Sequence, residues 1–326
     1  MNRVFVTRIL PEPAMARLRA ADLALDVWPE PGPPPYDELL RRVAGVHGLL
    51  TLLTDRIDAR LLDAAGPGLR VVSQMAVGVD NIDLAACTAR GIPVGHTPGV
   101  LSDAVADLTI GLMIATARRF FEANADMRAG RWTTWEPMGW TGPDLHGSTV
   151  GIVGLGRIGQ AVARRLQGFN VRLLYHNRRL HPQAEELGAT YVSLDDLLAA
   201  SDFVTLHCPY TPDTHHLIDA RALALMKPTA ILINTARGGV VDQDALLGAL
   251  RSGKIRAAGL DVFTPEPLPP DHPLLVLPNV VALPHVGSAS IATRIRMAEM
   301  AVENLLAGLA GRPLPHCANP DVYARA

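Results

Sequence analysis

The sequence predicts an α/β protein with two doubly wound domains, in which parallel sheets are covered by helices on both faces. Short apolar runs rich in β-branched residues alternate with longer helical patterns along the chain. These predicted strands fall into two groups, which are separated by a long helical segment. A chain of 326 residues is also too long for one ordinary hydrophobic core, which favours two domains over one.

Nine segments have the composition of buried strands, and the first three form one group while the last six form the other. They are Val4–Thr7, Gly48–Leu53, Val71–Gln74, Val150–Gly154, Val171–His176, Phe203–His207, Ala230–Thr235, Gly259–Val262 and Val280–Leu283. Between the groups, Ser102 is the predicted N-cap of a helix over 103–120, which is apolar around most of its circumference. We therefore expect this helix to be buried between domains or subunits. A last helix is predicted over Ile291–Leu309.

Composition and charge argue against several functional classes. The formal net charge of -2 gives no electrostatic basis for binding nucleic acid or an anionic membrane surface. The three cysteines form no CxxC pair and His215-His216 has no matching ligand spacing, so we expect no disulfide framework and no metal site. The N-terminal segment MNRVFVTRIL has no signal-peptide core, and the longest apolar stretch is about half of a membrane span. We expect a cytoplasmic protein that does not enter a membrane.

The segment TVGIVGLGRIGQAVARRL combines an apolar strand, a glycine-rich turn and an amphipathic helix. Gly154, Gly156 and Gly159 form a GxGxxG pattern, which is weak alone but strong in this strand–turn–helix setting. Gly154 allows a tight turn, Gly156 lets the backbone approach a pyrophosphate, and Gly159 lets helix and strand pack closely. The amides at the helix N-terminus then face phosphate oxygens, so we predict a dinucleotide-binding domain.

The end of the next predicted strand, LLYHNRR, determines which dinucleotide is expected. A unit that prefers NAD has an Asp or Glu here, which accepts hydrogen bonds from the adenine ribose. This chain instead has Asn177, Arg178 and Arg179. Guanidinium groups bind phosphate through paired, charge-assisted hydrogen bonds, which favours NADP(H) over NAD(H). The alternative is that the two arginines are solvated residues on a loop.

Three segments that follow late strands carry ionisable residues: INTARGGVVD, GLDVFTPEPLP and LPHVGSAS. The carboxyl ends of strands form the ligand crevice of a doubly wound sheet, so Arg237, Glu266 and His285 are candidates for one site. A carboxylate beside an imidazole favours the protonated ring, which suits a general acid. An Arg can bind a substrate carboxylate and polarise a carbonyl group. Together they suit the reduction of a 2-oxo acid, although each alone has a structural explanation.

These segments, together with VGVDNID, resemble the D-2-hydroxyacid dehydrogenase family, and most closely its glyoxylate/hydroxypyruvate reductases. The similarity extends over nearly the whole chain, from GLLTLLTDRID through AAGLDVFTPEPLPPDHPLL to NLLAGLAGRPLP. It implies a Rossmann cofactor domain at residues 100–287, inserted into a flavodoxin-like substrate domain formed by residues 1–99 and 288–326. Many family members have an Asp at the position of Asn177, so the NAD-type signature is absent here.

The resemblance also implies roles for individual residues. Arg237, Glu266 and His285 would be the catalytic residues. Arg237 and His285 would also contact the substrate, together with Leu53, the backbone of Val77 and Gly78, and Trp140. The cofactor would be bound by Gly154, Gly156, Arg157, Ile158, Gly159, Asn177, Arg178, Arg179, Pro209, Thr214, Thr235, Asp261 and Gly287. Among these, Asp261 would face the nicotinamide carboxamide.

Three tryptophans, Trp132, Trp135 and Trp140, lie close together in RWTTWEPMGWTG. Aromatic residues are enriched at subunit interfaces, so we predict that this segment anchors a homodimer. In similar reductases an equivalent segment places a Trp at the partner's substrate pocket, and Trp140 is the candidate here. The predicted function is NADPH-dependent reduction of small 2-oxo acids such as glyoxylate and hydroxypyruvate. The alternatives are another D-2-hydroxyacid dehydrogenase activity and a non-catalytic dinucleotide sensor that binds protein partners.

Overall fold

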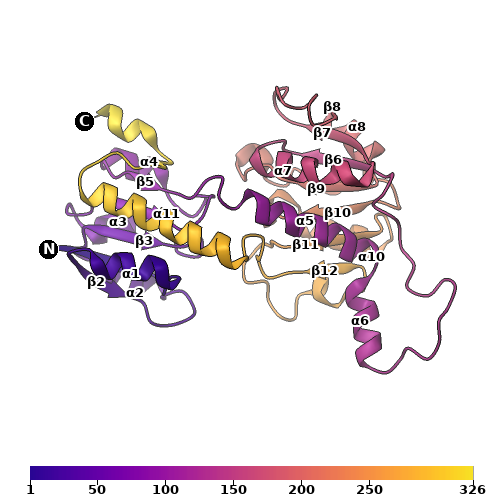
Figure 1. Cartoon of the computed structure of the whole chain (residues 1–326), viewed down its shortest axis with the longest axis horizontal. Coiled ribbons are helices and arrows are strands. Elements are labelled where there is room, and N and C mark those ends of the chain that lie inside the picture. The colour runs from indigo at the N-terminus through magenta and orange to yellow at the C-terminus, as the bar shows by residue number, and fades with distance from the viewer. Residues whose placement is uncertain (326) are drawn as a thin grey trace. The chain divides into compact units, whose positions relative to one another are not determined.

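The computed structural model describes residues 1–325, and the chain forms two compact units. The outer unit comprises Met1–Leu101 and the segment that begins at Ser288. The inserted unit comprises Ser102–Gly287. Each unit has its own parallel sheet (Figure 1). Each also has its own hydrophobic core, as the alternation of strand and helix patterns predicts.

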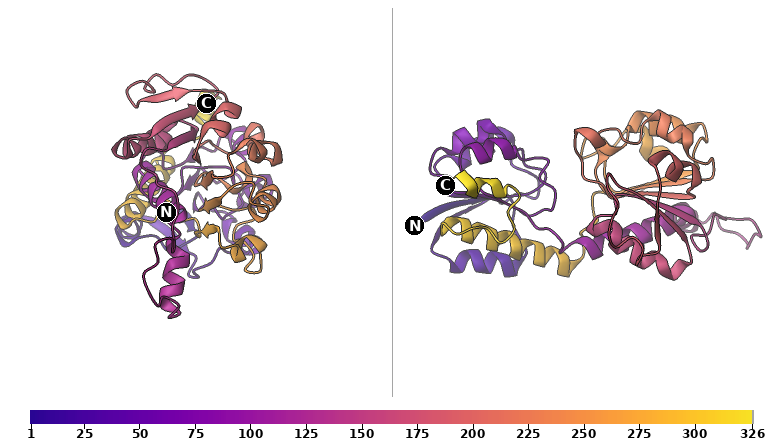
Figure 2. Two further views of the ribbon diagram at one scale, coloured as in Figure 1. Left: turned by 90° about the vertical axis from the view of Figure 1, so that its right-hand side faces the viewer. Right: turned by 90° about the horizontal axis from the view of Figure 1, so that it is seen from above.

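The outer unit contains a five-stranded parallel sheet with the order β2-β1-β3-β4-β5, which is the flavodoxin-like order. Its strands are β1 (Asn2–Val6), β2 (Leu23–Val27), β3 (Gly48–Thr51), β4 (Val71–Gln74) and β5 (Val94–Gly95). Its helices are α1 (Glu12–Ala20), α2 (Tyr36–Val43), α3 (Ala59–Ala65), α4 (Leu84–Ala89) and α11 (Ile291–Leu309). Helices α1 and α11 cover one face of the sheet, and α2, α3 and α4 cover the other (Figure 2).

The inserted unit contains a seven-stranded parallel sheet with the order β12-β11-β10-β9-β6-β7-β8. Its strands are β6 (Thr149–Val153), β7 (Arg172–His176), β8 (Ala189–Tyr191), β9 (Phe203–Leu206), β10 (Ile231–Asn234), β11 (Ala257–Leu260) and β12 (Val280–Ala282). Its helices are α5 (Ser102–Ala117), α6 (Phe120–Arg128), α7 (Arg157–Leu166), α8 (Leu194–Ala200), α9 (Ala220–Leu225) and α10 (Gln243–Arg251). Helices α5 and α7 contribute to the core on one face of this sheet, and α8, α9 and α10 contribute to the core on the other.

The direction of strand addition reverses at β6, which pairs with both β7 and β9. In an open doubly wound sheet, ligands bind at the carboxyl ends of the strands where this reversal occurs. The glycine-rich turn follows β6 and the segment His207–Pro209 follows β9, so both lie at this point. The fold therefore places the predicted cofactor-binding turn where a doubly wound sheet binds its ligand.

All nine predicted strands lie on observed strands, with ends that differ by no more than two residues. The two predicted parallel-sheet α/β folds are confirmed. The strands β2, β5 and β8 were not predicted. Two of them, β2 and β8, are edge strands whose exposed side chains break the apolar pattern, and β5 has only two residues.

The predicted helix over 103–120 is wrong in its extent, because two helices occupy this segment. Helix α5 ends at Ala117 and α6 begins at Phe120. Between them, Arg119 adopts a left-handed backbone conformation with a φ of 53°, which interrupts the helical geometry. Helix α5 packs against α7, β10 and β11 of its own unit, and these contacts account for the burial that we expected between domains or subunits.

Candidate active site

The three glycines of the turn after β6 differ in what requires them: close neighbours require Gly154 and Gly159, whereas Gly156 leaves open space beside the backbone. Gly154 has a φ of 99°, and a Cβ there would lie 2.6 Å from the nitrogen of Cys208. A Cβ on Gly159 would lie 2.2 Å from the carbonyl oxygen of Gly154, so only glycine lets α7 approach the turn. A Cβ on Gly156 would meet nothing within 4 Å, which leaves its backbone open to a ligand. The turn therefore fits a bound pyrophosphate.

A cavity of about 870 Å³ opens at this turn, within the inserted unit. Seven of the predicted cofactor-binding residues line it: Gly154, Gly156, Asn177, Arg178, Arg179, Pro209 and Thr214. Arg157, Ile158 and Gly159 begin helix α7 beside it. Thr235, Asp261 and Gly287 follow strands β10, β11 and β12 at the same edge of the sheet. The size and the position of the cavity suit a dinucleotide.

The side chain of Asn177 takes part in holding the glycine-rich turn. Its Oδ1 atom accepts a hydrogen bond of 2.7 Å from the N–H group of Leu155. The next residue, Arg178, is exposed, and its Nη1 lies 3.9 Å from Oδ2 of the exposed Asp213, which lines the same cavity. Arg179 is also exposed. The two guanidinium groups therefore bring positive charge to the place where a ribose carboxylate would otherwise lie.

His207 lies at the end of β9 and lines the same cavity, but nothing in its sequence context singled it out. Burial lowers the pKa of its imidazole to about 3. Its Nε2 contacts Thr205 Oγ1 at 2.9 Å, while its Nδ1 is inaccessible and has no hydrogen-bond partner within residues 1–325. His207 is therefore neutral near pH 7 and adds no positive charge to the cavity.

Glu266 and His285 form a close ion pair. Nδ1 of His285 lies 2.7 Å from Oε2 of Glu266, and both side chains are 27% exposed. The other carboxylate oxygen of Glu266 accepts a hydrogen bond of 2.8 Å from the N–H group of Phe263. Burial acts to raise the pKa of Glu266, but the hydrogen bond and charge of His285, the Phe263 amide and the charge of Arg237 outweigh it and lower that pKa. The carboxylate is therefore ionised at neutral pH.

Asp261 holds the turn that carries His285. Its carboxylate accepts hydrogen bonds of 2.8 Å from the N–H groups of Val286 and Gly287, and its carbonyl oxygen accepts one of 2.9 Å from His285. His285 itself has a φ of 54°, a conformation that costs energy for a non-glycine residue. Burial raises the pKa of Asp261 despite the opposing effect of the two amides and of His285. Asp261 therefore fixes the histidine turn, and its contact with the nicotinamide carboxamide stays a prediction of the resemblance.

Arg237 is half-buried in the loop after β10, and a neighbouring asparagine shapes that loop. The buried side chain of Asn234 donates to the carbonyl oxygen of Arg237 at 2.9 Å and accepts from the N–H group of Ala236 at 3.0 Å. A Cβ on Gly238 would lie 2.0 Å from the carbonyl carbon of Phe263, so this loop touches the loop that leads to Glu266. Asn234 was not predicted, although a polar residue at the end of an apolar strand is a usable signal.

The predicted substrate-binding residues of the outer unit lie at one edge of its sheet. Leu53 follows β3, while Val77 and Gly78 follow β4, and Leu53 and Gly78 are half-buried. Because β3 and β4 are adjacent and parallel, their carboxyl ends lie side by side. The structure thus brings together the two segments of this unit to which the resemblance assigns substrate contacts.

The tryptophan-rich segment follows α6 and is largely exposed. Trp132 and Trp135 are 58% and 77% exposed, whereas Trp140 is half-buried. The guanidinium carbon of Arg119 lies 4.8 Å from the centre of the Trp140 ring, in a cation–π contact. The structure thus separates Trp140, which packs on its own chain, from the two tryptophans that project into solvent.

Neither a metal cluster nor a membrane-spanning helix is found among residues 1–325. No group of three or more His, Cys, Asp or Glu side chains in this range is arranged to hold a metal ion. None of its helices combines the length and the apolar character that a membrane span requires.

Comparison with known proteins finds relatives over almost the whole chain. Residues 110–287 match the family described as D-isomer specific 2-hydroxyacid dehydrogenase, NAD binding domain. The glyoxylate reductase/hydroxypyruvate reductase of Homo sapiens is 52% identical over 318 residues, which cover 97% of this chain and 97% of that protein. A crystal structure of a Thermus thermophilus protein has a TM-score of 0.92 at 52% identity and covers 97% of this chain and 99% of that one. The NADPH-dependent glyoxylate/hydroxypyruvate reductase of Sinorhizobium meliloti, solved with NADP and malonate, has a TM-score of 0.83 at 36% identity, with 98% of each chain covered.

Proposed function

The chain belongs to the D-isomer specific 2-hydroxyacid dehydrogenase family, and we propose that it reduces small 2-oxo acids to 2-hydroxy acids with NADPH. The observation that carries this proposal is the ion pair of 2.7 Å between His285 and Glu266, beside the loop of Arg237. The names of relatives that share half of the sequence or more support glyoxylate and hydroxypyruvate as substrates. Both are small acids with a carboxylate next to a carbonyl group, and these are the two groups that the proposed site would recognise.

His285 is the proposed general acid. Glu266 occupies its Nδ1, so the Nε2–H group is the one that donates to the substrate. The reduced nicotinamide, when bound, supplies a hydride to C2 of the oxo acid. The Nε2 proton passes to the oxygen of the former carbonyl group, which becomes the hydroxyl group of the product. His285 is then neutral and takes up a proton from solvent before the next reaction.

Arg237 is the proposed anchor of the reacting end of the substrate. Its guanidinium group can donate two hydrogen bonds to the carboxylate or the carbonyl oxygen of a 2-oxo acid. Because its Nη1 also donates to the carbonyl oxygen of Ala236 at 2.8 Å, the side chain is held by its own loop. A preorganised positive charge at a carbonyl oxygen stabilises the negative charge that develops during hydride transfer.

Arg178 and Arg179 are the proposed binding groups for the 2′-phosphate of NADPH. Both side chains line the cavity that contains the glycine-rich turn, and neither is buried against the protein. Asn177, at the position of the usual ribose carboxylate, is neutral and engages Leu155. No negative charge from that position therefore repels a phosphate. The relative from Sinorhizobium meliloti, which is NADPH-dependent, supports the same choice.

The tryptophan-rich segment is the proposed dimer contact. Phe120, Phe121 and Met138 are 53%, 53% and 77% exposed, and they belong to the same stretch of chain as Trp132 and Trp135. Exposed apolar side chains gathered in this way mark interaction surfaces, and a second copy of the chain is the partner that we propose. Trp140, which lies on Arg119, is the proposed contact to the partner's substrate pocket.

The proposed function is tested by following NADPH oxidation by its absorbance with glyoxylate, hydroxypyruvate and pyruvate, each measured again with NADH. We expect turnover with the first two acids and a higher kcat/KM with NADPH than with NADH. A protein that binds NADPH but oxidises it with none of the three acids would contradict the proposed substrates and leave the two alternatives, another D-2-hydroxyacid dehydrogenase activity or a dinucleotide sensor. Equal kcat/KM values for the two cofactors would contradict the proposed role of Arg178 and Arg179.

A further inference from the structure

The main-chain carbonyl groups of the loop after β4 are held by a set of hydrogen bonds. Three successive carbonyl oxygens have partners within the outer unit. The partners are the N–H group of Thr97 for Ala76 at 2.9 Å, Nδ1 of His96 for Val77 at 3.0 Å, and Nε2 of Gln74 for Gly78 at 2.5 Å. A carbonyl oxygen only accepts, so Nδ1 of His96 carries the proton of its contact. The carbonyl groups of this loop therefore face protein donors.

This arrangement determines where the amide groups of the loop point. The peptide bonds of the loop are trans, so each N–H group points away from the carbonyl oxygen of the same peptide. The N–H groups of Val77, Gly78 and Val79 therefore point away from Thr97, His96 and Gln74, respectively. None of these three N–H groups donates to a protein acceptor within residues 1–325. Main-chain N–H groups that have no protein acceptor are available to an anion such as a carboxylate.

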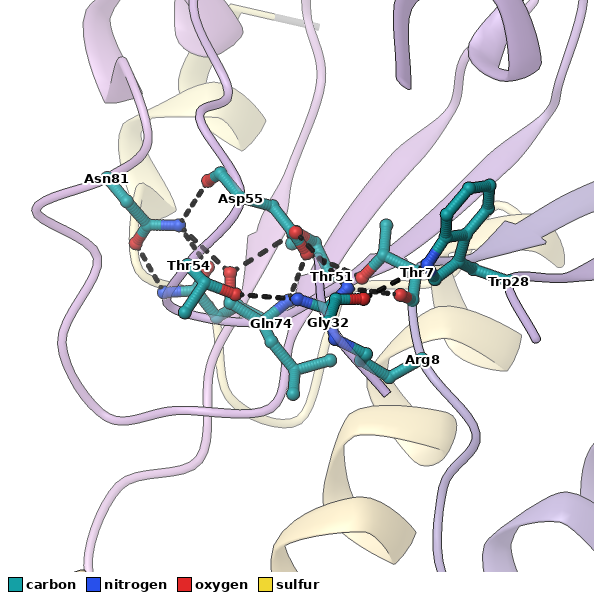
Figure 3. Close-up of polar contacts among 10 residues, drawn as sticks. Thr7, Arg8, Trp28, Gly32, Thr51, Thr54, Asp55, Gln74 and Asn81 are labelled. Atoms are coloured by element: carbon teal, nitrogen blue, oxygen red, sulfur yellow. Dashed lines mark hydrogen bonds and ion pairs between the residues drawn. The ribbon is translucent and has the colours of Figure 1, made fainter. Parts of the chain in front are cut away.

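A pair of side-chain amides links this loop to the turn that carries Leu53 (Figure 3). Gln74 and Asn81 exchange two hydrogen bonds of 2.8 Å, one in each direction. The Nδ2 group of Asn81 also contacts the carbonyl oxygens of Asp55 at 2.7 Å and Leu52 at 3.2 Å. The amide pair therefore joins both segments of the outer unit to which we assign substrate contacts.

Hydrogen bonds to the carboxylate of Asp55 hold the turn that carries Leu53. The carboxylate of Asp55 is buried, and its Oδ2 accepts hydrogen bonds from Thr51 Oγ1 at 2.8 Å, from the N–H group of Leu52 at 2.9 Å and from Thr7 Oγ1. These contacts come from the carboxyl ends of β1 and β3. Because the hydrogen bonds of Asp55 fix this turn, the contacts of Asn81 with the turn also fix the position of the loop after β4.

We propose that Gln74 and Asn81 are positioning residues for the substrate carboxylate. Their amide pair holds the N–H groups of the 77–79 segment and the turn of Leu53 in one arrangement, so that a 2-oxo acid is bound by amides that need no reorganisation. The proposal rests on the proposed function, because it assigns a role in binding the acid that is reduced. Neither side chain touches the substrate, so their effect is on the geometry of the main chain.

The test compares two variants with a matched control from the same strand. Gln74→Met keeps the side-chain size at a buried position but removes both of its donated hydrogen bonds, while Asn81→Ala removes the partner at a half-buried position. Ser73→Ala is the control, since the buried Ser73 hydroxyl is the neighbouring polar group of β4 and donates to Ala301, on α11. The measurements are kcat and KM for glyoxylate, the inhibition constant of oxalate, and KM for NADPH.

Both test variants are expected to raise KM for glyoxylate and the inhibition constant of oxalate about ten- to a hundredfold, because misplaced binding groups lose their complementarity. The KM for NADPH and the pH profile should stay unchanged. The double variant should be no worse than the poorer single variant, since both substitutions break one pair. Ser73→Ala should leave all of these constants unchanged.

Two different results would overturn the proposal, and they are distinguishable. If the unmodified protein reduces 2-oxo acids and the test variants match Ser73→Ala in every constant, the positioning role is wrong and the proposed function stands. If the unmodified protein reduces no 2-oxo acid, the proposed function is wrong and this proposal is wrong with it. Should Gln74→Met fail to fold, Asn81→Ala alone decides whether the positioning role holds.

Discussion

The inserted unit and the outer unit each carry candidate site residues, and the two sets use different chemical groups. In the inserted unit the groups are ionisable side chains, namely Glu266, His285 and Arg237 beside one another and Arg178 at the cavity of the glycine-rich turn. In the outer unit the groups are main-chain amides, and hydrogen bonds from the side chains of Gln74 and His96 hold their loop in place. Charged side chains can transfer protons or recognise phosphate, whereas fixed amides can bind an anion but change no bond. Under the proposed function, the inserted unit would supply the proton donor and the cofactor site, and the outer unit would supply amides that bind the acid.

The largest effect is expected for His285→Ala, which tests whether the inserted unit supplies the proton donor. Loss of the proton donor should lower kcat about 10²–10⁴-fold with little change in KM for glyoxylate.

Arg237→Ala should lower kcat and also raise KM, because a guanidinium group that holds the acid acts in both the ground state and the transition state. Steady-state kinetics at one pH separates the two patterns. A His285→Ala variant that changed only KM would show that the inserted unit serves recognition and that its imidazole is no proton donor.

Arg178→Ala tests the second charged group of the inserted unit. A lost charge-assisted contact to the 2′-phosphate should lower the preference for NADPH over NADH by about 1.5–3 kcal/mol, or roughly ten- to a hundredfold. Arg172→Ala is a matched control, because Arg172 is an exposed arginine at the other end of β7. The measurement is the ratio of kcat/KM for the two cofactors. If both variants keep the original ratio, Arg178 is a solvated loop residue and contributes nothing to cofactor choice.

The same difference between the units explains what the sequence could predict. Arg237, Glu266 and His285 were predicted because each is an ionisable residue just after an apolar strand, and the resemblance then supplied their roles. Gln74 and Asn81 were not predicted, because amide side chains at strand ends are common in turns. Asn81 also contacts the carbonyl oxygens of Asp55 and Leu52, which are 26 and 29 residues away from it in sequence. Such a contact exists only once β3 and β4 lie side by side.

The strands of the fold were predictable where their side chains are buried on both faces of the sheet. Strands buried on both faces, such as β10 with four buried residues, have continuous apolar sequences that reveal them. Strand β2 alternates between half-buried and exposed residues at the edge of its sheet, so its sequence LALDV carries a weaker signal. The break between α5 and α6 was also hidden, because arginine at position 119 does not by itself predict a left-handed backbone.

Trp140→Ala tests an indole side chain, which is neither an ionisable group nor a main-chain amide. If this indole reaches the partner's pocket, its removal should favour branched 2-oxo acids over glyoxylate by about 1–3 kcal/mol, since steric discrimination is graded. Trp135→Ala is the comparison from the same segment, because the 77% exposed Trp135 belongs to the proposed dimer contact but not to the proposed pocket contact. The substrate ranking and the sedimentation behaviour are measured for both variants. A dimeric Trp140→Ala variant with the original ranking would limit Trp140 to packing on Arg119.

The smallest expected effect is a change in the pH profile caused by Glu266→Gln. Glutamine keeps the size of the side chain and its oxygen acceptor but removes the charge beside His285. The imidazole then loses its carboxylate contact of 2.7 Å, so the kcat/KM profile should move toward lower pH. Asp271→Asn is the control, because it removes one exposed negative charge from the same loop region without touching the pair.

The sign of the effect on stability follows from the direction of the Glu266 pKa. That pKa is lowered in the folded protein, so the stability that the ionised pair contributes is present above the ordinary pKa of a glutamate. It is lost as the pH falls through the lower folded value, and Glu266→Gln should lack this acid-side dependence. Thermal unfolding at neutral and acidic pH measures it, beside the kinetic profile. If both the profile and the acid-side stability of Glu266→Gln equal those of Asp271→Asn, Glu266 does not control the charge of His285. The inserted unit would then owe its proton transfer to the histidine alone.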